Sequence, residues 1–223
     1  MTSVQLAAHG LIFDLDGTLI STQAATERAY TKYARVHSID PAPIVHFCHG
    51  VPTLQVLRKF FPAHTHTHEF AQKMELESAA DLDGLCAIAG AKDLVASVPV
   101  NKWAIFTSGM PFLAHPRMNH LGLPIPGVFV TPADVTHGKP HPEGYLLAAK
   151  RLGFDAKCCI VFEDARAGVE AGAEAGAVVV GVRTLLTDAE LKAAGAQYTV
   201  SDMTKVSVAA KDDGTLVVTI DED

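Results

Sequence analysis

The sequence predicts an α/β fold in which helices cover both faces of a parallel sheet and a helical module follows the first strand. Three observations support this prediction: the short apolar runs are continuous, helical stretches separate them, and residues 21–90 lack strand patterns. Continuous apolar runs suit parallel strands that are buried on both faces, whereas strands with one exposed face alternate apolar and polar residues. Helices that alternate with such strands give a doubly wound sheet.

The expected strands and helices of this sheet follow from local sequence. The strands are the apolar runs GLIF (10–13), WAIF (103–106), GVFV (127–130), CIVF (159–162) and AVVVGV (177–182). Residues 142–153, PEGYLLAAKRLG, begin with a proline suited to the first helical turn and end with a glycine typical of helix termination. Residues 166–176, RAGVEAGAEAG, repeat small residues at helical spacing, which lets a helix pack closely on the sheet.

Residues 21–90 are expected to form a separate cap, because about eighty residues pass before the next strand. The amphipathic stretches in this insert are ATERAYTKYARVH (25–37), TLQVLRKFF (53–61) and HEFAQKMELESAADL (68–82), joined by the loops DPAPI and HGVP. The core is then expected to comprise residues 1–20 and 91–223. At its end, residues 205–223 carry two alternating segments around the dipeptide DG, which predicts a hairpin added antiparallel to the sheet edge.

The composition excludes several classes of protein. With 48% hydrophobic and 19% charged residues among 223, the chain is an ordinary globular protein. The net charge of −7 argues against a nucleic-acid partner, which needs a basic surface. No apolar run approaches the roughly 18 residues of a membrane span. The four cysteines show no paired spacing, and the first segment, MTSVQLAAHG, has no signal-peptide features. Both observations indicate a cytoplasmic protein. We expect it to be a monomer.

Two acidic residues, Asp14 and Asp16, follow the first expected strand in the segment FDLDGTLIS. Two carboxylates so close together repel each other and lose solvation, so their arrangement calls for a cation between them. The carboxyl ends of parallel strands meet at one edge of a sheet, where ligands collect. The other residues that follow expected strands are Thr107, Ser108 and Gly109 after the second, Lys139 after the third, and Glu163 and Asp164 after the fourth.

This set of residues predicts a site for Mg²⁺ and a phosphate group. Mg²⁺ prefers oxygen ligands at roughly 2.0–2.1 Å, and the candidate ligands are the acids Asp14, Asp16, Glu163 and Asp164. Asp164 is expected to bind the ion directly, and Glu163 is expected either to bind it or to orient the residues that do. Asp16 can also offer its backbone carbonyl.

The same residues predict phosphoryl transfer to water. Asp14 can attack phosphorus as a nucleophile and form an aspartyl-phosphate. Asp16 can protonate the leaving alkoxide and later deprotonate water. Lys139 supplies positive charge to the phosphoryl oxygens and keeps Asp14 ionised. Thr107 and the N–H groups after it can hydrogen-bond those oxygens. The expected partner is therefore a small phosphorylated metabolite.

The four motifs FDLDGTL, FTSG, GKPHPEGY and VFEDARAGVEAG resemble, in order, those of the haloacid-dehalogenase-like phosphohydrolase superfamily. The resemblance covers nearly the whole chain and implies a Rossmann-like core with a helical cap inserted after the first strand. Dehalogenating relatives lack the second aspartate, so Asp16 implies phosphate transfer. The segments CHGVPTLQVLRKF, KWAIFTSGM and VTHGKPHPEGYL resemble the glycerol-3-phosphatase and 2-deoxyglucose-6-phosphatase branch, which implies Mg²⁺-dependent hydrolysis of a small polyol or sugar phosphate.

A loop of the expected cap carries His49 and Gly50, for which two interpretations stay open: contact with the substrate, or simple turn geometry. The branch named above usually has an arginine just after this His-Gly pair. This chain has Val51-Pro52 there instead, so a substrate-facing cation is missing at that position.

Other ionisable residues are expected to have structural roles. Lys73 and Glu75 are expected on a solvated face of a cap helix. Arg166 is expected to begin a helix or to pair with Glu170, although contact with the substrate is an alternative. The segment HTHTH (64–68) has a spacing that suits neither a helix face nor a zinc site, so it predicts a polar loop that enters a helix.

Two other functions stay open. A phosphomutase of the same superfamily, of the β-phosphoglucomutase type, would return the phosphoryl group to a bound sugar. The segment STQAATERAYTKY, early in the cap, has no histidine to position such an intermediate. A non-catalytic binding protein would keep the fold, but the complete set of acids and lysine argues against it.

Overall fold

The computed structural model describes residues 2–49 and 51–222. The strands of its central sheet are β2 (Gly10–Phe13), β5 (Trp103–Phe106), β6 (Val128–Val130), β7 (Cys159–Glu163), β8 (Val178–Val182) and β9 (Tyr198–Val200). They run parallel in the order β6-β5-β2-β7-β8-β9. The predicted fold class and the five predicted strands are confirmed, and β9 is an additional edge strand. Because β2 lies between β5 and β7, the residues that follow these three strands meet at one place.

Helices cover both faces of this sheet. The core helices are α5 (Ala91–Ser97), α6 (Pro111–Leu121), α7 (Glu143–Leu152), α8 (Arg166–Glu174) and α9 (Asp188–Ala194). Successive side chains of a strand point to opposite faces, so Leu11 and Phe13 of β2 pack into one apolar core and Ile12 packs into the other. Residues of α5 and α6 complete the first core, and residues of α7, α8 and α9 complete the second.

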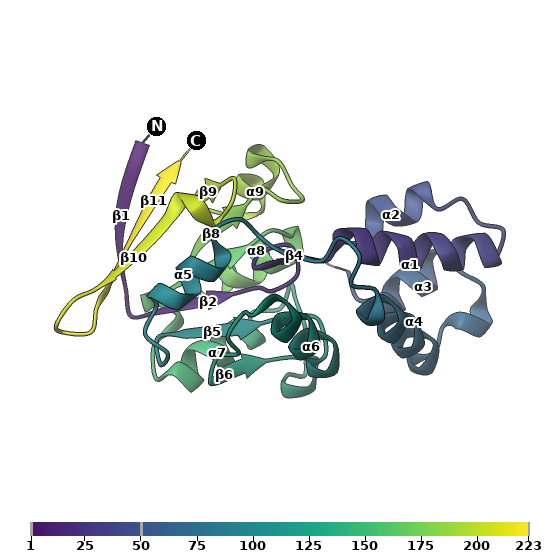
Figure 1. Cartoon of the computed structure of the whole chain (residues 1–223), viewed down its shortest axis with the longest axis horizontal. Helices are drawn as coiled ribbons and strands as arrows, with labels where there is room; N and C mark the ends of the chain where they lie inside the picture. Colours follow the sequence, from purple (N-terminus) through teal and green to yellow (C-terminus); the bar gives the residue numbers. More distant parts are fainter. Residues whose placement is uncertain (1, 50, 223) are drawn as a thin grey trace.

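The C-terminal hairpin forms as predicted, but it lies elsewhere than predicted. The strands of a second, antiparallel sheet are β1 (Thr2–Ala8), β11 (Leu216–Glu222) and β10 (Val206–Ala210), in that order. This sheet is separate from the parallel one, whereas the sequence analysis expected the hairpin at the edge of the parallel sheet and did not predict β1. Burial explains the difference: Leu216, Val218 and Ile220 alternate along β11 and are fully buried in the same core as Phe13. The hairpin therefore packs with one face on the core, at the end of the molecule away from α1 (Figure 1).

A bundle of four helices stands beside the core (Figure 1). These helices are α1 (Gln23–Val36), α2 (Ala42–Cys48), α3 (Thr53–Phe60) and α4 (His68–Ala80). Their buried side chains, among them Tyr33, Ile44, Leu57 and Met74, form an apolar cluster of their own. Among the described residues, every helix is too short or too polar to span a lipid bilayer.

The structure corrects two details of the expected insert. The segment DPAPI is not only a loop, because α2 begins within it. Asp40 accepts the N–H of Ala42 at 3.1 Å, Pro41 is the N-cap and Pro43 lies in the first helical turn. The insert also contains a short strand where none was expected. The two connections between bundle and core pair antiparallel, and their strands are β3 (Ile20–Ser21) and β4 (Cys86–Ala87).

Short 3₁₀ turns complete the chain. They are η1 (Ala63–Thr65), η2 (Pro132–Asp134), η3 (Ala156–Cys158) and η4 (Met203–Lys205). The HTHTH segment falls in η1 and at the start of α4, where Thr67 accepts the N–H of Phe70 as a helix cap. The polar-loop interpretation of that segment is therefore confirmed.

Candidate active site

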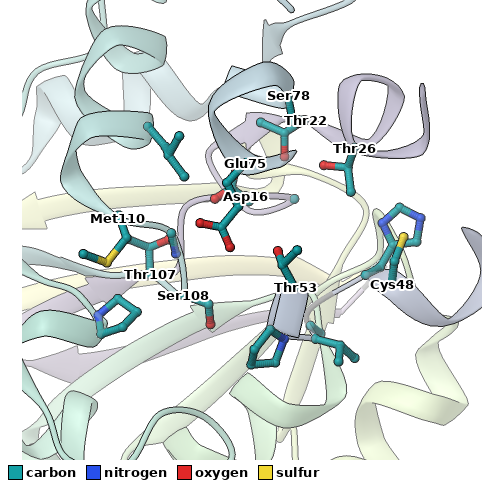
Figure 2. A pocket seen from close by; sticks show the side chains of 18 of the residues that line it. Asp16, Thr22, Thr26, Cys48, Thr53, Glu75, Ser78, Thr107, Ser108 and Met110 are labelled. Atoms are coloured by element: carbon teal, nitrogen blue, oxygen red, sulfur yellow. The ribbon is translucent and has the colours of Figure 1, made fainter. Parts of the chain in front are cut away.

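A cavity of about 640 Å³ lies between the carboxyl end of the parallel sheet and the helical bundle. The residues that line it from the sheet side include Asp14, Asp16, Thr107, Ser108, Gly109, Lys139, Glu163 and Asp164. The residues that line it from the bundle include Thr22, Thr26, Cys48, His49, Thr53, Glu75 and Ser78. Figure 2 shows Asp16 and Thr53 directed into this cavity from its two sides. The structure thus brings together the strand-end residues that the sequence analysis selected.

A buried cluster of charge forms the floor of the cavity. Oxygens of Asp14, Glu163 and Asp164 lie within 4.8 Å of one another. Lys139 donates hydrogen bonds to Asp14 Oδ1 and to Glu163 Oε1, the latter at 2.6 Å. The side chain of Lys139 is only 5% exposed. Three carboxyl groups therefore share one ammonium group, and with all three ionised the cluster would carry more negative than positive charge.

Burial and proximity change the titration of this cluster. Burial raises the pKa of Asp14 to about 7, although the neighbouring Lys139 opposes that rise. Burial, followed by the charge of Glu163, raises the pKa of Asp164 well above its usual range. For Lys139, burial alone would lower the pKa, but the carboxylates of Asp14 and Glu163 outweigh it and the pKa is raised. A further cation would relieve this crowding of acids, and their oxygens are the hard donors that Mg²⁺ takes. The residues therefore fit a magnesium ion.

Glu163 already has several hydrogen-bond donors around its carboxylate. Its Oε1 accepts from Lys139 and, at 3.0 Å, from the hydroxyl of Tyr145. Its Oε2 accepts the backbone N–H groups of Asp164 and Ala165, each at 2.9 Å. Glu163 therefore fixes the lysine and the loop after β7, and Asp164 is left with the more available oxygens. Tyr145 was missed in the sequence, although it ends the motif GKPHPEGY.

Two glycines leave the space that these acids occupy. Gly17 has φ of +95°, and a Cβ atom there would lie 1.9 Å from Asp164 Oδ2. A Cβ atom on Gly168, in α8, would lie 1.6 Å from Glu163 Oε1. Thr184, which the sequence analysis missed, donates to the carbonyl of Gly17 and lies 3.4 Å from Asp164 Oδ2. These small or bridging residues set where Asp164 and Glu163 can lie.

The loop after β5 faces Asp16 across the cavity. Thr107 is buried, and its Oγ1 accepts the N–H of Gly109 at 2.9 Å. Ser108 is exposed to the cavity. The side chain of Asp16 is 34% exposed, and Nη1 of Arg117 lies 3.5 Å from its Oδ1. This side of the site therefore offers hydroxyl and N–H donors beside a carboxylate that solvent and substrate can reach.

The bundle side of the cavity combines apolar and polar side chains with the ionisable groups of Arg58 and Glu75. Glu75 lies on the cavity side of α4, where burial raises its pKa and a hydrogen bond from Thr53 opposes that rise (Figure 2). The sequence analysis placed Glu75 on a solvated face, and that prediction is wrong, whereas Lys73 is exposed as predicted. The helix turn explains this, because Ala71, Glu75 and Ser78 lie on one side of α4.

The cap loop after α2 also reaches the cavity. His49 lines it, and its Nε2 lies 3.2 Å from Glu27 Oε1. Val51 and Pro52 line it as well, so this part of the wall is apolar and lacks the arginine that the resemblance in sequence implied after the His-Gly pair. Gly50, which the sequence analysis selected as a substrate-binding candidate, lies outside the described residues.

Two other groups of residues hold local structure. Arg166 begins α8, and its Nη1 lies 3.9 Å from Glu170 on the exposed surface. His137 and His141, on the loop that carries Lys139, cluster with Glu143, the first residue of α7. The carboxylate of Glu143 accepts the N–H groups of Thr136 and His137, at 2.8 and 2.9 Å, and so shapes that loop.

The fold and the site together define an α/β enzyme whose strand-end acids and lysine lie beneath a helical bundle. The sequence model of the family of haloacid dehalogenase-like hydrolases matches residues 9–176 of this chain. The chain is 36% identical to 2-deoxyglucose-6-phosphate phosphatase 1 of Saccharomyces cerevisiae, over 97% of this chain and 96% of that protein. It is 40% identical to hexitol phosphatase A of Escherichia coli, over 79% and 84% of the two chains. A crystal structure of a hydrolase from Pseudomonas syringae matches with a TM-score of 0.71 and 27% identity, over 87% and 93%.

This chain therefore belongs to the haloacid dehalogenase-like hydrolases. It is an enzyme, a phosphatase of that family, as its resemblance in sequence implied.

Proposed function

We propose that this enzyme is a Mg²⁺-dependent phosphatase that hydrolyses a small polyol or sugar phosphate monoester through phospho-Asp14. One observation carries the proposal: Asp14, Asp164 and Lys139, which come from three different strand ends, share one buried cluster that opens into the cavity. That is the arrangement a phosphoryl group and a divalent cation require.

In the proposed first step, a carboxylate oxygen of Asp14 attacks phosphorus and the bond from phosphorus to the ester oxygen breaks. The carboxyl group of Asp16 gives its proton to the departing alkoxide, which leaves as an alcohol. In the second step, the Asp16 carboxylate takes a proton from a water molecule as that water attacks phosphorus. The bond from phosphorus to the Asp14 oxygen breaks, inorganic phosphate leaves, and the Asp14 carboxylate is regenerated.

Charge and hydrogen bonds support both steps. Lys139 neutralises part of the phosphoryl charge, and its contacts with Asp14 and Glu163 hold the ammonium group in place. Thr107 and the N–H group of Ser108 are proposed to hold the phosphoryl oxygens, and the N–H of Gly109 would turn to them from Thr107 Oγ1, which accepts it here. Mg²⁺, when bound, supplies electrostatic stabilisation of the phosphoryl oxygens, and its proposed ligands are the Asp14 and Asp164 carboxylates and the backbone carbonyl of Asp16.

The helical bundle is proposed to be the cap that selects the leaving group. In this division, residues 21–90 form the cap, and residues 1–20 and 91–223 form the catalytic core. The bundle side of the cavity presents hydroxyl groups and the carboxylate of Glu75, which suit the hydroxyls of a polyol or sugar. A cap that closes over the site also excludes water from the reacting groups.

The relatives support the substrate class, because their names specify 2-deoxyglucose 6-phosphate, hexitol and glycerol 1-phosphate phosphatases. Within the proposal, the enzyme acts as a cytoplasmic monomer on a small phosphorylated metabolite, with no nucleic-acid or membrane partner.

The proposal is tested with purified protein and a panel of phosphorylated polyols, hexoses and nucleotides, assayed for inorganic phosphate with and without Mg²⁺. The expected result is Mg²⁺-dependent release of phosphate, fastest with a polyol or sugar phosphate. Accumulation of an isomeric sugar phosphate, with little free phosphate, would instead indicate a mutase. Release of no product from any substrate would contradict the proposal.

A further inference from the structure

Arg117, on α6, connects the catalytic core to the helical bundle. Its guanidinium Nη2 donates to the carbonyl of Ser78 at 3.0 Å and lies 3.3 Å from the Ser78 hydroxyl. Its Nη1 lies 3.5 Å from Oδ1 of Asp16. The side chain is only 8% exposed. One buried cation therefore touches both α4 of the bundle and the acid that follows β2.

The guanidinium group of Arg117 has few anionic groups near it. A buried guanidinium group needs an anionic partner, because removal of a charge from water is costly. Among the described residues, Asp16 is the carboxylate within ion-pair distance of Arg117. The more distant Asp81 is held mainly by Arg28, at 2.7 Å. Asp16 is therefore the principal counter-ion of Arg117.

The contact with Ser78 lies at the end of a helix. The last carbonyls of a helix have no partner within it and carry partial negative charge, which favours a cation. Ser78 is in the last turn of α4, which ends at Ala80, and its carbonyl accepts the N–H of Asp81 at 3.3 Å besides the guanidinium group. Arg117 thus binds the end of α4 only while the bundle lies against the core, as it does here.

The position of Arg117 also orients the carboxyl group of Asp16. Its Nη1 faces Oδ1, whereas Oδ2 faces the loop after β5: a Cβ atom on Gly109 would lie 3.5 Å from Oδ2. That loop is where the phosphoryl group is proposed to bind. With Oδ1 turned to the guanidinium group, Oδ2 is the oxygen turned towards the proposed phosphoryl site. When Oδ2 carries the proton, Oδ1 still accepts from Arg117, which also keeps its contacts with Ser78.

We propose that Arg117 is a positioning residue. Its contact with Ser78 forms when the cap closes on the core, and its contact with Asp16 then places the Asp16 carboxyl group against the leaving oxygen. The inference rests on the proposed function, and it assigns Arg117 no contact with the substrate. It follows that loss of Arg117 impairs proton donation to the alcohol more than it impairs attack by Asp14.

The test compares leaving groups in Arg117→Gln and Arg117→Lys. An alkyl phosphate, the best substrate of the panel, needs a proton on its leaving oxygen, whereas p-nitrophenyl phosphate releases a stable phenolate without one. The value of kcat/KM includes only the steps through departure of the leaving group, so it reports the first step alone. Because a positioned acid contributes about 10²–10⁴-fold, we expect Arg117→Gln to lose about 100-fold in kcat/KM with the alkyl phosphate. With p-nitrophenyl phosphate we expect a loss of less than about threefold in kcat/KM.

A split between kcat and kcat/KM sharpens the test. With p-nitrophenyl phosphate, kcat of Arg117→Gln should fall more than kcat/KM, because Asp16 must still activate water in the second step. Arg117→Lys keeps the charge but not the planar fork that joins two partners, so an intermediate loss is expected. The matched control is Arg151→Gln, which removes an exposed ion pair with Asp134, 2.8 Å long, and should leave both substrates unaffected. Melting curves of each variant show whether it folds, and Arg117→Lys carries the test if Arg117→Gln does not.

Three outcomes count against the proposal. Equal losses with both substrates would show a merely structural role for Arg117. A rise in KM for the alkyl phosphate at unchanged kcat would show direct substrate binding instead. Both of these results overturn this inference and leave the proposed function standing. A wild-type protein that hydrolyses neither substrate would overturn the proposed function, and this inference with it.

Discussion

The two sides of the active-site cavity are built differently. On the sheet side, Asp14, Lys139 and Glu163 hold one another through buried ion pairs, and the backbone at strand ends fixes where they lie. On the bundle side, polar groups project from helices, and Thr53 interacts with both Glu75 and Tyr30 without an ion pair among them. The difference indicates that the chemistry depends on a rigid set of charges, whereas substrate choice depends on side chains that can change without disturbing that set.

The largest effect is expected from Asp14→Asn, which removes the proposed nucleophile. Phosphate release should fall below about one per cent of wild type, because an amide cannot form the covalent intermediate. Folding should stay nearly intact, because burial disfavours the charged form of Asp14 and the neutral amide of asparagine does not carry that cost. Phosphate assays and melting curves of the same preparations check both parts. Activity above that level in a folded variant would break the proposed contrast between the two sides.

A second large effect is expected from Gly168→Ala. The new Cβ atom would overlap Glu163 Oε1, so the carboxylate must leave Lys139 or α8 must shift. Overpacking of this kind costs about 1–3 kcal/mol of stability. We also expect a loss of about 100-fold in kcat, the scale associated with one misplaced electrostatic group.

The matched control for this variant is Gly127→Ala, because a Cβ atom on Gly127 meets no atom within 4 Å among the described residues. That control should keep wild-type activity and melting temperature. If Gly168→Ala behaves like the control, the sheet side is less rigid than the structure indicates.

An effect of about tenfold is expected in Mg²⁺ affinity between pH 8 and pH 6. The pKa of Asp14 is about 7 without the ion. Below pH 7 magnesium must therefore displace the proton of the Asp14 carboxyl group, whereas above pH 7 that group is already ionised. Asp164, whose pKa is also raised, adds to the effect in the same direction. Calorimetric titration at the two pH values measures this. An affinity independent of pH would indicate that neither carboxylate binds the ion.

The smallest effects are expected from two acids of α4. Burial raises the pKa of Glu75, so the folded protein holds that proton more tightly than the unfolded chain and loses stability as pH rises above about 4.5. Glu75→Gln should therefore melt higher than wild type at pH 7, with little difference at pH 4. Glu77 lies two residues on, and a hydrogen bond from Lys32 lowers its pKa.

Glu77→Gln is thus the matched control with the opposite sign. In the wild type, the Glu77 carboxylate stabilises the fold above the pKa of the unfolded chain. That stabilisation is lost as pH falls through the pKa of the folded protein. Glu77→Gln should therefore melt slightly lower than wild type at pH 7. Melting temperatures of the three proteins at pH 4 and pH 7 decide the matter. If both substitutions shift the melting temperature in the same direction, the contrast between the buried and the exposed acid is not supported.

The same contrast explains what could be predicted from the sequence. Continuous apolar runs define buried parallel strands, and the residue after each run must lie at one edge of the sheet. The positions of Asp14 and Asp164 therefore followed from local patterns. Lys139 lies further along, beyond η2, and the motif GKPHPEGY was needed to select it.

The bundle side could not be predicted in this way. Whether Glu75 faces solvent or cavity depends on how α4 is rotated against the core, which no local pattern records. Arg117 lies 101 residues from Asp16 and 39 from Ser78 in sequence, and it belongs to no motif. The hairpin was located wrongly for a related reason, because the burial of one face of β11 on the core depends on long-range packing.

The most direct test of the central claim, that Asp14 is the nucleophile of the buried cluster, is covalent trapping. Asp16→Asn should still accept a phosphoryl group from p-nitrophenyl [³²P]phosphate but should hydrolyse the intermediate slowly. After acid quench, the account predicts up to one label per chain, labile to hydroxylamine, on the peptide that contains residue 14. No label should form when Asp14→Asn is added to the same chain. Label on another residue, or label that persists in the double variant, would contradict the account.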